Sequence, residues 1–399
     1  MLTPTEAAAQ VAASVRPLPV ETLPLPAAFG RCLREAVRAE RDQPPFDRVA
    51  MDGIAIASAA VAAGRRHFHI AGVAPAGAPR ARLSSTEAAI EAMTGAVLPE
   101  DSDAVVPVER IRVTGGQVEI DPDVGVEPWM NVHRQASDAR AHDIVLPAGV
   151  RLGAVEIALA ASAGRAELEV ARLPRIAIVS TGDELIDPGH PIAAHQVRRS
   201  NPYALAAALA RRGYTDVVLR HARDDRRTIE TLLAAELASR DVILLSGGVS
   251  AGQFDFVPQS LEALGVRKVF HKVAQRPGKP LWFGVGPAGQ LVFGLPGNPV
   301  SVMVCVARYV ADALERMTGF EPAPTPRAAL AEDVRFHARL AYFLPVRLEY
   351  DGSGRMLARP NPTGGSGDFV RLAGTQGFLE LPPGPVELEP GTVAPLYYW

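Results

Sequence analysis

The stretch that decides the fold is Leu173–Leu185, which reads L-P-R-I-A-I-V-S-T-G-D-E-L. Its apolar run, residues 176–179, is hydrophobic at both alternate positions, as expected of a strand buried on both faces of a parallel sheet. The run ends in Ser180–Glu184, where small residues meet two adjacent carboxylates. Ligands of open α/β sheets bind beyond the carboxyl ends of the strands, so this acidic turn is a candidate site. An ordinary solvated turn is the alternative interpretation.

Two more buried strands later in the chain also run into glycine-rich turns. Residues 241–245 (D-V-I-L-L) lead into 246–255, S-G-G-V-S-A-G-Q-F-D, whose glycines allow backbone N–H groups to curl around an anion. Residues 291–293 (L-V-F) lead into 294–301, G-L-P-G-N-P-V-S. Pro299 suits the start of a helix, where free N–H groups favour phosphate. Each turn alone is weak evidence, but the three together predict an α/β domain with an anion site.

Length, charge and cysteine content limit the class of protein. A chain of 399 residues is long enough for several domains, each with its own core. A net charge of −3 argues against nucleic-acid binding, which usually requires a basic excess. Cys32 and Cys305 form neither a disulfide framework nor a metal-binding pattern, which favours a reducing, cytoplasmic location. The chain begins without a signal-like segment and has no run of about 18 apolar residues, so we expect no contact with a membrane.

The N-terminal third contains two expected helices and an extended segment. Residues 3–15 and residues 27–39 (A-A-F-G-R-C-L-R-E-A-V-R-A) are each predicted to form a helix. Residues 43–53, Q-P-P-F-D-R-V-A-M-D-G, are held extended by their two prolines and end in a turn. Short strands and glycines over residues 54–135 predict a mainly β region.

Two polar residues of this region are candidate functional groups. Asp52 either caps its turn or acts in a site, and the local sequence favours neither. Thr94, in Met93-Thr94-Gly95-Ala96, offers a hydroxyl group beside a permissive glycine. The hydroxyl is a plausible oxyanion contact, although most such threonines only close turns.

A basic loop lies in the second half of the chain. Residues 272–280, K-V-A-Q-R-P-G-K-P, place three cations around a rigid Pro-Gly turn. Because the prolines fix the loop, an anion clamp is favoured over a solvated loop. The proline-rich segment 321–326 then leads to a last domain, whose alternating patterns at 378–381 and 386–388 predict a small β-barrel or sandwich.

Carboxylates, cations and glycine cradles gather in the predicted loops. Oxygen ligands without cysteine or histidine suit Mg²⁺, and cations with backbone N–H groups suit phosphates. The residues therefore indicate metal-assisted chemistry at a phosphate or phosphoanhydride, without naming a substrate. The groups are the carboxylates Asp52, Asp138, Asp183, Glu184, Asp224 and Asp255 and the cations Lys272, Arg276 and Lys279.

Six ordered motifs resemble those of the molybdopterin molybdenumtransferase family, which is related to the C-terminal domain of gephyrin, and the resemblance runs from about residue 3 to residue 390. They are P-P-F-D-x-x-A-M-D-G, M-T-G-A, S-T-G-D-E-L, S-G-G-V-S-x-G-x-x-D, R-P-G-K-P and G-L-P-G-N-P-V-S. The resemblance implies that molybdate, or tungstate, is inserted into the dithiolene of adenylylated molybdopterin. It also implies that Mg²⁺ assists cleavage of the phosphoanhydride and that AMP and molybdenum cofactor are released.

The resemblance further implies a multidomain α/β and β fold and an elongated homodimer whose cleft draws on both subunits. Transfer contacts with the adenylyltransferase and with apo-molybdoenzymes are expected, and nucleic acid is not. Four domains are expected: a split helical linker domain (1–47 plus 136–172), an inserted β domain (48–135), a doubly wound α/β molybdopterin-binding domain (173–320) and a C-terminal β-barrel-like domain (321–399).

Matching positions imply functions for individual residues. Glu184 and Asp255 are expected near the phosphoanhydride and, with Asp224, as ligands of Mg²⁺. Lys272 and Arg276 are expected to hold molybdate or phosphate. The implied catalytic set is Asp52, Thr94, Asp138, Glu184, Asp224 and Asp255. The implied substrate-binding set is Thr181, Gly182, Asp183, Ser246, Gly247, Gly248, Ser250, Lys272, Arg276, Lys279, Pro296, Gly297, Asn298 and Ser301.

The chain departs from the family pattern at several positions. Arg48-Val49 stands where Asn-Ser is more frequent, and Arg199-Ser200-Asn201 replaces Asp-Ser-Asn or Asp-Thr-Asn. Ala136-Ser137 precedes Asp138 in place of Gly-Glu, and Tyr342-Phe343-Leu344-Pro345 lacks an arginine often found there. Ser366 aligns loosely with a family serine. These departures leave the preferred oxyanion and the pterin form open.

Two alternative functions also stay open. One is a molybdopterin adenylyltransferase, which shares the α/β domain and would be distinguished by consumption of ATP. The other is a non-catalytic scaffold on the same fold, which would bind adenylylated molybdopterin without turnover.

Overall fold

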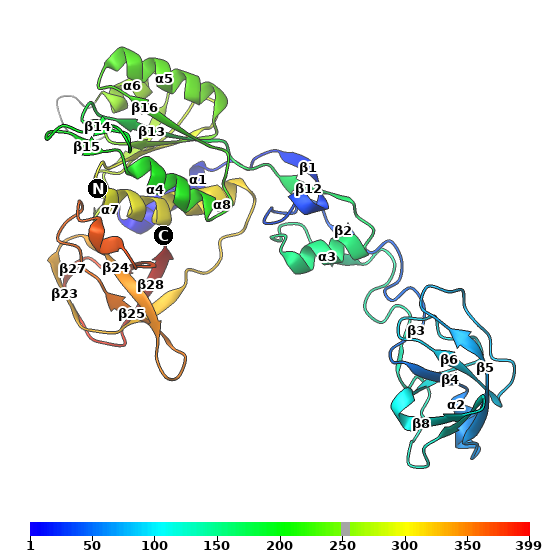
Figure 1. The fold of residues 1–399 in the computed structure, drawn as a ribbon. Coiled ribbons are helices and arrows are strands. Elements are labelled where there is room, and N and C mark those ends of the chain that lie inside the picture. The colour runs from blue at the N-terminus through cyan, green and yellow to red at the C-terminus, as the bar shows by residue number, and fades with distance from the viewer. Residues whose placement is uncertain (249–255) are drawn as a thin grey trace. The chain divides into compact units, whose positions relative to one another are not determined.

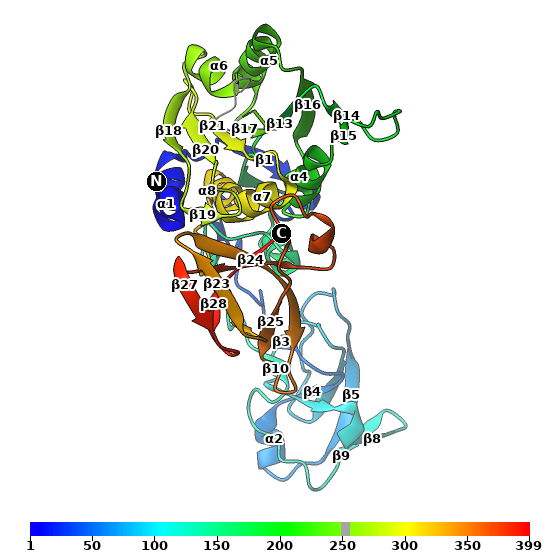
Figure 2. The same cartoon turned by 90° about the vertical axis from the view of Figure 1, so that its left-hand side faces the viewer.

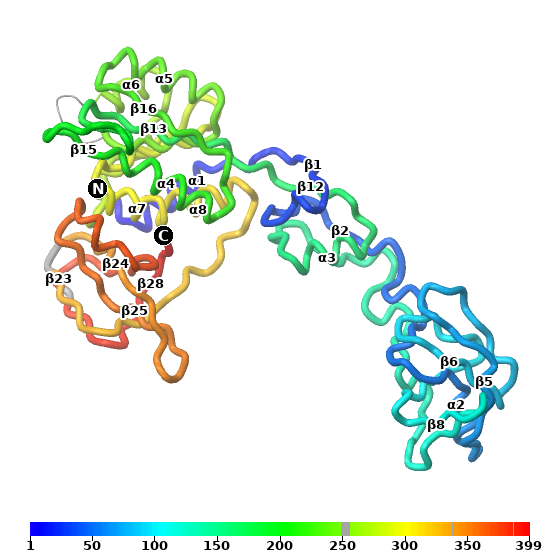
Figure 3. The backbone as a smooth tube through the Cα atoms, in the orientation of Figure 1, coloured from blue at the N-terminus to red at the C-terminus, as the bar shows by residue number. Residues whose placement is uncertain are grey.

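The computed structural model describes residues 1–248 and 256–399, which divide into two compact units. The chain passes between the units near residues 21–33 and again near 169–170 (Figure 3). At this passage β1 (Val20–Pro24) pairs with β12 (Glu167–Ala171). No helix of the described residues is long and apolar enough to cross a membrane. Unit 1 comprises residues 1–21, 30–32 and 170–399, and unit 2 comprises residues 22–29 and 33–169.

Unit 1 is built on a six-stranded sheet with the strand order β16-β13-β17-β21-β20-β18. The first four strands are parallel, and β20 runs antiparallel to both of its neighbours. The run predicted as a central strand is β13, whose residues are all buried, which explains why it lacks polar alternation. The bounds are β13 Ile176–Thr181, β16 Val217–Ala222, β17 Val242–Ser246, β18 Arg267–His271, β20 Trp282–Val285 and β21 Leu291–Leu295.

Helices cover both faces of this sheet, so the predicted doubly wound α/β fold is confirmed (Figures 1 and 2). On one face Val179 and Leu245 of the sheet pack against α5 and α6. On the other face Ile178 packs in a core with α1, α4, α7, the π-helical segment η3 and α8. The bounds are α1 Pro4–Ser14, α4 Asn201–Ala210, α5 Arg226–Ser239, α6 Val257–Ala263, α7 Pro299–Cys305, η3 Val306–Val310 and α8 Ala311–Met317.

The first helix belongs to the core of this α/β fold. The helix predicted over residues 3–15 is confirmed as α1, and Thr3 and Glu6 form a reciprocal capping box at its start. Ala7 and Val11 are buried in the core that contains Leu314 of α8. The boundary at residue 47 stays a prediction, but the structure packs α1 with the α/β strands and helices.

The prediction of a helix over residues 27–39 is wrong. The structure contains the 3₁₀ turn η1 (Leu25–Ala27), which ends at the first residue of this segment, and the short strand β2 (Val37–Arg38) within it. Gly30 has a φ of +77°, which no α-helix contains. The Leu33 N–H donates to the Val150 carbonyl at 3.0 Å, so tertiary pairing replaces the helical hydrogen bonds. Local apolar spacing was overridden by this long-range pairing.

The C-terminal region forms a closed barrel, as predicted. β24 pairs with both β25 and β26, which closes the order β24-β25-β22-β28-β26. Val346, Leu379 and Leu396 fill its interior. The strand β19 (Gln275–Arg276), which comes from the basic loop, adds to the edge of β24. The other bounds are β22 Arg327–Leu330, β23 Val334–Ala338, β24 Ala341–Tyr350, β25 Met356–Pro360, η4 Val370–Leu372, β26 Gly377–Leu381, β27 Gly384–Leu388 and β28 Val393–Tyr398.

Unit 2 contains a second six-stranded sheet, in the order β7-β4-β6-β5-β9-β8, so residues 54–135 are mainly β as predicted. Ile54 and Ala55 of β4 point into two different apolar cores, one on each face of the sheet. The bounds are β3 Arg48–Val49, β4 Gly53–Ile56, α2 Ser58–Ala62, β5 His67–Ala74, β6 Ala88–Ala92, β7 Ala104–Pro107, η2 Val108–Arg110, β8 Ile111–Thr114, β9 Gln117–Ile120, β10 Val132–His133, β11 Ile144–Leu146 and α3 Ala154–Ser162.

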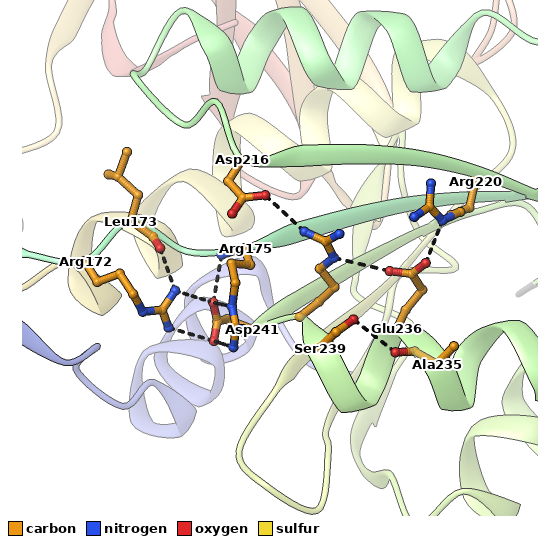
Figure 4. A network of polar contacts seen from close by, with 10 residues as sticks. Arg172, Leu173, Arg175, Asp216, Arg220, Ala235, Glu236, Ser239 and Asp241 are labelled. Carbon is orange, nitrogen blue, oxygen red and sulfur yellow. Dashed lines mark hydrogen bonds and ion pairs between the residues drawn. The ribbon is translucent and has the colours of Figure 1, made fainter.

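An ionic network closes the amino-terminal edge of the sheet in unit 1 (Figure 4). Asp241, just before β17, accepts two hydrogen bonds of 2.9 Å from the guanidinium of Arg172. It also accepts one of 2.7 Å from the backbone N–H of Arg175, just before β13. One carboxylate therefore ties together the starts of two central strands. Burial raises the pKa of Asp241, but the hydrogen bonds from the two arginines outweigh burial and lower the pKa below 3.8.

Replacement of this carboxylate should destabilise unit 1. Asp241→Asn leaves two arginines without their anionic partner, and we expect a loss of about 2 kcal/mol at pH 7, measured as a shift of the urea midpoint. Because the pKa of Asp241 is lowered in the folded state, the carboxylate's contribution is present above about pH 4 and disappears as the pH falls through the folded-state value. The variant and the wild type should therefore converge in acid.

Asp216→Asn is the matched control. This half-exposed carboxylate pairs with Arg240 at 3.0 Å, and its loss should cost less than about 0.5 kcal/mol. Equal losses in the two variants at pH 7 would contradict the structural importance given to Asp241.

Candidate active site

The carboxyl ends of three neighbouring parallel strands lie level with one another in unit 1. Ser180 of β13 is paired in register with Ser246 of β17, and Ser246 with Leu295 of β21. The three polar turns predicted from the sequence therefore begin at the same edge of the sheet. This edge opens into two clefts.

The first is the strand-end cleft, a cavity of about 510 Å³. It lies directly beyond the carboxyl ends of β13 and β17, where open α/β sheets bind their ligands. Its lining combines hydroxyl groups, one carboxylate, two arginines and three glycines. The lining residues are Ser180, Thr181, Glu184, Leu185, Val197 to Pro202, Ser246, Gly247, Gly297, Asn298, Pro299 and Gly367.

The second is the barrel cleft, a cavity of about 620 Å³ between the same turns and the C-terminal barrel. It shares Gly247, Gly297 and Asn298 with the strand-end cleft, so the two cavities adjoin. Its cations are Arg276 and Lys279. The lining residues are Gly247, Gly248, Gln275 to Pro280, Pro296 to Asn298, Ser301, Leu340, Tyr342, Thr363, Gly365 and Ser366.

Glycine is required where the two clefts adjoin. Gly247 and Gly248 have φ values of +98° and +66°, in the left-handed region that glycine adopts without strain. A Cβ atom on Gly248 would lie 2.8 Å from the Thr181 hydroxyl oxygen and 2.8 Å from a methyl carbon of Val257. A Cβ atom on Gly297 would lie 3.9 Å from the Gly247 Cα. The two glycine turns therefore leave backbone, rather than side chains, at the junction of the clefts.

The hydroxyl of Thr181 is a candidate ligand contact. Thr181 is the last residue of β13 and only 5% exposed, and its hydroxyl oxygen has no hydrogen-bond partner among residues 1–248 and 256–399. A buried polar group without a partner is costly, and it is commonly satisfied by water or a ligand. Because the hydroxyl lies in the strand-end cleft, we favour a bound ligand over water as its partner.

Glu184 is the carboxylate of the strand-end cleft. Its side chain folds back over the turn, so that a Cβ atom on Gly182 would lie 2.6 Å from its Oε2. Gly182 has a φ of +140°, and its carbonyl lies 3.0 Å from the Nε2 of His221. In the part of the chain that the structure describes, no hydrogen bond or ion pair occupies the Glu184 carboxylate oxygens.

Two asparagines join the turns around the clefts. Asn201, at the start of α4, donates to the Ser246 hydroxyl and to the Gly297 carbonyl, both at 2.8 Å. Asn298, just before α7, donates to the Ser366 hydroxyl of the barrel at 2.6 Å. Ser366 also accepts a backbone hydrogen bond of 3.2 Å from Val300, which attaches the barrel to the start of α7.

The departure at residue 199 places an arginine in the strand-end cleft. Arg199 is 8% exposed and donates to the Asp187 carboxylate at 2.7 Å. Its Nη1 also lies 3.3 Å from the Arg220 carbonyl. The positive charge of Arg199 is therefore paired with the carboxylate of Asp187 within unit 1.

Three of the implied catalytic residues lie in unit 2. The Asp52 carboxylate accepts from the backbone N–H and the hydroxyl of Thr94, at 2.6 and 2.7 Å. Both hydrogen bonds lower the pKa of Asp52, and the bond from the hydroxyl has the larger effect. Asp138 lies 2.8 Å from the Nε2 of His133, whose Nδ1 lies 2.9 Å from Arg48. The hydrogen bond from His133 is the main reason that the pKa of Asp138 is lowered.

The structure brings together most, but not all, of the implied substrate-binding residues of unit 1. Asp183 and Lys272 are exposed, and neither they nor Gly182 line either cleft. Asp224 follows β16 at the same edge of the sheet but also lies outside both linings. Ser250 and Asp255 fall outside the described residues.

Several lining residues were missed by the sequence interpretation. Asn201 and Ser366 enter the sequence analysis only through comparison with the family motifs. Local signals could have indicated them, because Asn201 precedes a proline typical of a helix start and Ser366 lies between two glycines. Tyr342 and Leu340 reach the barrel cleft because β24 pairs with β19 of the basic loop. No local pattern predicts such a pairing between segments about 65 residues apart.

Comparison with known families matches most of the chain. Residues 2–164 match the MoeA N-terminal region (domains I and II), residues 177–316 match a probable molybdopterin binding domain, and residues 327–399 match the MoeA C-terminal region (domain IV).

Individual relatives are similar over almost the full length. The chain is 40% identical over 379 residues to the molybdopterin molybdenumtransferase of Synechocystis, covering 95% of each protein. It is 32% identical over 396 residues to molybdopterin molybdenumtransferase 2 of Mycobacterium tuberculosis, covering 96% of this chain and 95% of that protein. It matches the crystal structure of the molybdopterin biosynthesis MoeA protein of Pyrococcus horikosii with a TM-score of 0.82 and 29% identity, covering 100% of this chain and 99% of that one.

These features define a multidomain protein of the MoeA type, with an α/β domain, a closed C-terminal barrel and a site at the strand ends. The sequence similarity then gives the family directly. The chain belongs to the molybdopterin molybdenumtransferase family.

The glycine at the junction of the clefts gives a stability prediction. Gly248→Ala combines left-handed backbone strain with close contacts to Thr181 and Val257, so we expect a loss of about 3 kcal/mol. Gly213→Ala is the control, because Gly213 also has a positive φ, +86°, but no atom lies within 4 Å of its Cβ position. The control should lose only about 1 kcal/mol in urea unfolding. Equal losses would mean that the close packing at Gly248 does not restrict the turn.

Proposed function

We propose that this chain inserts molybdate into adenylylated molybdopterin, with cleavage of the phosphoanhydride and release of AMP and molybdenum cofactor. Relatives similar over about 95% of the chain carry the name molybdopterin molybdenumtransferase, which supports this reaction. The observation that carries the proposal is the pair of adjoining clefts at the strand ends. Together they offer backbone cradles, the carboxylate of Glu184 and the exposed cations Arg198, Arg276 and Lys279 in a single continuous region.

In this proposal the two clefts hold different parts of the substrates. Gly247, Gly248 and Gly297 present backbone at the junction, where phosphate oxygens can approach closely. Arg276 and Lys279 supply positive charge in the barrel cleft for molybdate or phosphate. The hydroxyl groups of Thr181 and Ser246 orient the bound ligand from the strand ends.

Glu184 is proposed to act at the phosphoanhydride. Its carboxylate lies in the strand-end cleft without a partner in the described residues, which leaves both oxygens available. Such oxygens fit Mg²⁺, which favours carboxylates together with substrate phosphates. Within residues 1–248 and 256–399 no group of three His, Cys, Asp or Glu side chains is placed to hold a metal ion, so in this part of the chain Glu184 would bind Mg²⁺ together with substrate oxygens. Asp255, another predicted ligand, lies outside these residues. Bound Mg²⁺ would neutralise charge that develops on the phosphate oxygens.

Release of AMP tests the proposed reaction. The purified protein is incubated with adenylylated molybdopterin and Mg²⁺, with and without molybdate or tungstate. We expect AMP release that requires one of the oxyanions and a product that activates an apo-molybdoenzyme. Binding without AMP release would favour the scaffold alternative, and consumption of ATP with molybdopterin would favour the adenylyltransferase alternative.

Glu184→Gln should abolish the reaction while the protein stays folded. Removal of the charge leaves the size of the side chain unchanged, so we expect kcat for AMP release to fall at least about 100-fold. The matched control is Glu230→Gln on α5, which removes an ion pair with Arg226 at 2.7 Å and should leave kcat within about twofold. Full activity of Glu184→Gln would remove Glu184 from the catalytic set.

We also propose the remaining features implied by the family resemblance. These are a homodimer whose cleft draws on both subunits, a cytoplasmic location, and transfer contacts with an adenylyltransferase and with apo-molybdoenzymes. Asp52, Thr94 and Asp138 are proposed as the unit 2 contribution to catalysis. The hydrogen bonds that hold Asp52 and Asp138 as carboxylates support this assignment.

A further inference from the structure

A fully buried amide lies beneath the basic loop. Gln275 belongs to β19, between the α/β sheet and the barrel, and its relative exposure is 0%. The next residues along the chain include Arg276 and Lys279, the two cations of the barrel cleft. Gln275 therefore lies below the part of the loop that presents charge to the site.

The amide of Gln275 makes contacts on both sides. Its Oε1 accepts a short hydrogen bond from the Tyr309 hydroxyl. Its Nε2 donates to the carbonyl of Pro277 at 3.2 Å and lies 3.7 Å from the Sγ of Cys305. These contacts use the acceptor and both N–H groups of the amide, as burial of such a group requires.

The direction of the chain of hydrogen bonds is fixed by Tyr309. The tyrosine is 1% exposed, and burial, followed by the nearby Cys305 thiol, raises its pKa well above 10. Its hydroxyl therefore stays protonated and donates to Gln275 Oε1. The amide NH₂ then has to face Pro277, which orients the turn that separates Arg276 from Lys279.

The loop fits tightly around this amide. Gly278 has a φ of +92°, and a Cβ atom there would lie 2.5 Å from the Gln275 Nε2 and 2.9 Å from the Cys305 Sγ. The backbone of the loop is also bonded to itself, since the Val273 N–H donates to the Lys279 carbonyl at 2.9 Å. The turn can therefore follow the position of the amide closely.

Tyr309 reaches the loop from an unusual helical segment. It lies in η3, a π-helical stretch between α7 and α8. Such stretches are rare and are often found at functional sites. Here Asn298, which lines both clefts, is the residue just before α7, so the same continuous helical run contacts both the glycine turn and the basic loop.

We propose that Gln275 and Tyr309 are positioning residues, which hold Arg276 and Lys279 in place to bind the anionic part of the substrates. Neither residue is proposed to touch substrate. They act through the Pro277 carbonyl and the turn that follows it. The proposal rests on the function proposed above for the barrel cleft.

Three variants and a control test the proposal. Tyr309→Phe removes one hydroxyl, Gln275→Leu removes the amide, and the double variant removes both. The control is Tyr398→Phe in the barrel, which removes a hydroxyl whose partner is the Met356 sulfur at 3.9 Å. For each protein we would measure KM and kcat for AMP release, hydrogen exchange of the peptide 272–281, and the urea midpoint.

The proposal predicts a specific pattern. Tyr309→Phe should raise KM for molybdate or for adenylylated molybdopterin about tenfold, with kcat within about twofold, because one lost hydrogen bond is worth about a factor of ten. Exchange in peptide 272–281 should be about tenfold faster than in the control. Each single variant leaves a buried polar group without its partner, whereas the double variant removes both the amide and the hydroxyl. The double variant should therefore be more stable than the single variants predict together. Its KM should stay raised, because the Pro277 carbonyl still lacks its donor.

Two results would overturn the proposal. In the first, exchange of peptide 272–281 is unchanged in Tyr309→Phe, or rises equally throughout unit 1. In the second, KM recovers together with stability in the double variant, which would indicate a purely structural contribution. The exchange measurement needs no turnover, so it still decides the positioning of the loop if the wild type releases no AMP and the proposed reaction itself fails.

Discussion

The register of the parallel strands β13, β17 and β21 is the constraint on which the rest of the site depends. Ser180, Ser246 and Leu295 lie level in the ladder, so three turns far apart in the sequence start at one edge. A slip by one residue would turn alternate side chains to the opposite face and move one turn away from the others. The buried apolar residues on both faces of these strands prevent such a slip, because each has to face its own helical layer.

The same edge divides its tasks between backbone and side chains. Gly247, Gly248 and Gly297 leave space at the junction of the clefts, where a side chain would collide with Thr181 or fill the opening. Charge is supplied from further away, by Glu184 on one side and by the basic loop on the other. The barrel completes the second cleft because β24 pairs with the basic loop and Ser366 bonds to Asn298.

Much of this could be predicted from the sequence because the relevant signals are local. The uninterrupted apolar run of β13, the glycine turns after β17 and β21, and Thr3 and Pro4 at the start of α1 each indicate their structure within a few residues. The helix expected over residues 27–39 failed because Leu33 pairs with Val150, a contact that local spacing cannot reveal. Gln275 and Tyr309 were missed for the same reason. An ordinary polar residue becomes important only when folding buries it beside a partner 34 residues away.

The measurement that tests the central claim most directly is a crystal structure of the protein with adenylylated molybdopterin and Mg²⁺, in the absence of molybdate and tungstate. We predict that the phosphates lie against Gly247, Gly248 and Gly297, with Glu184 on one side and Arg276 on the other. Such a position would show that the level strand ends form the substrate site of this chain. A ligand bound elsewhere in unit 1, for example at the Arg172–Asp241 network of the opposite edge, would contradict the account.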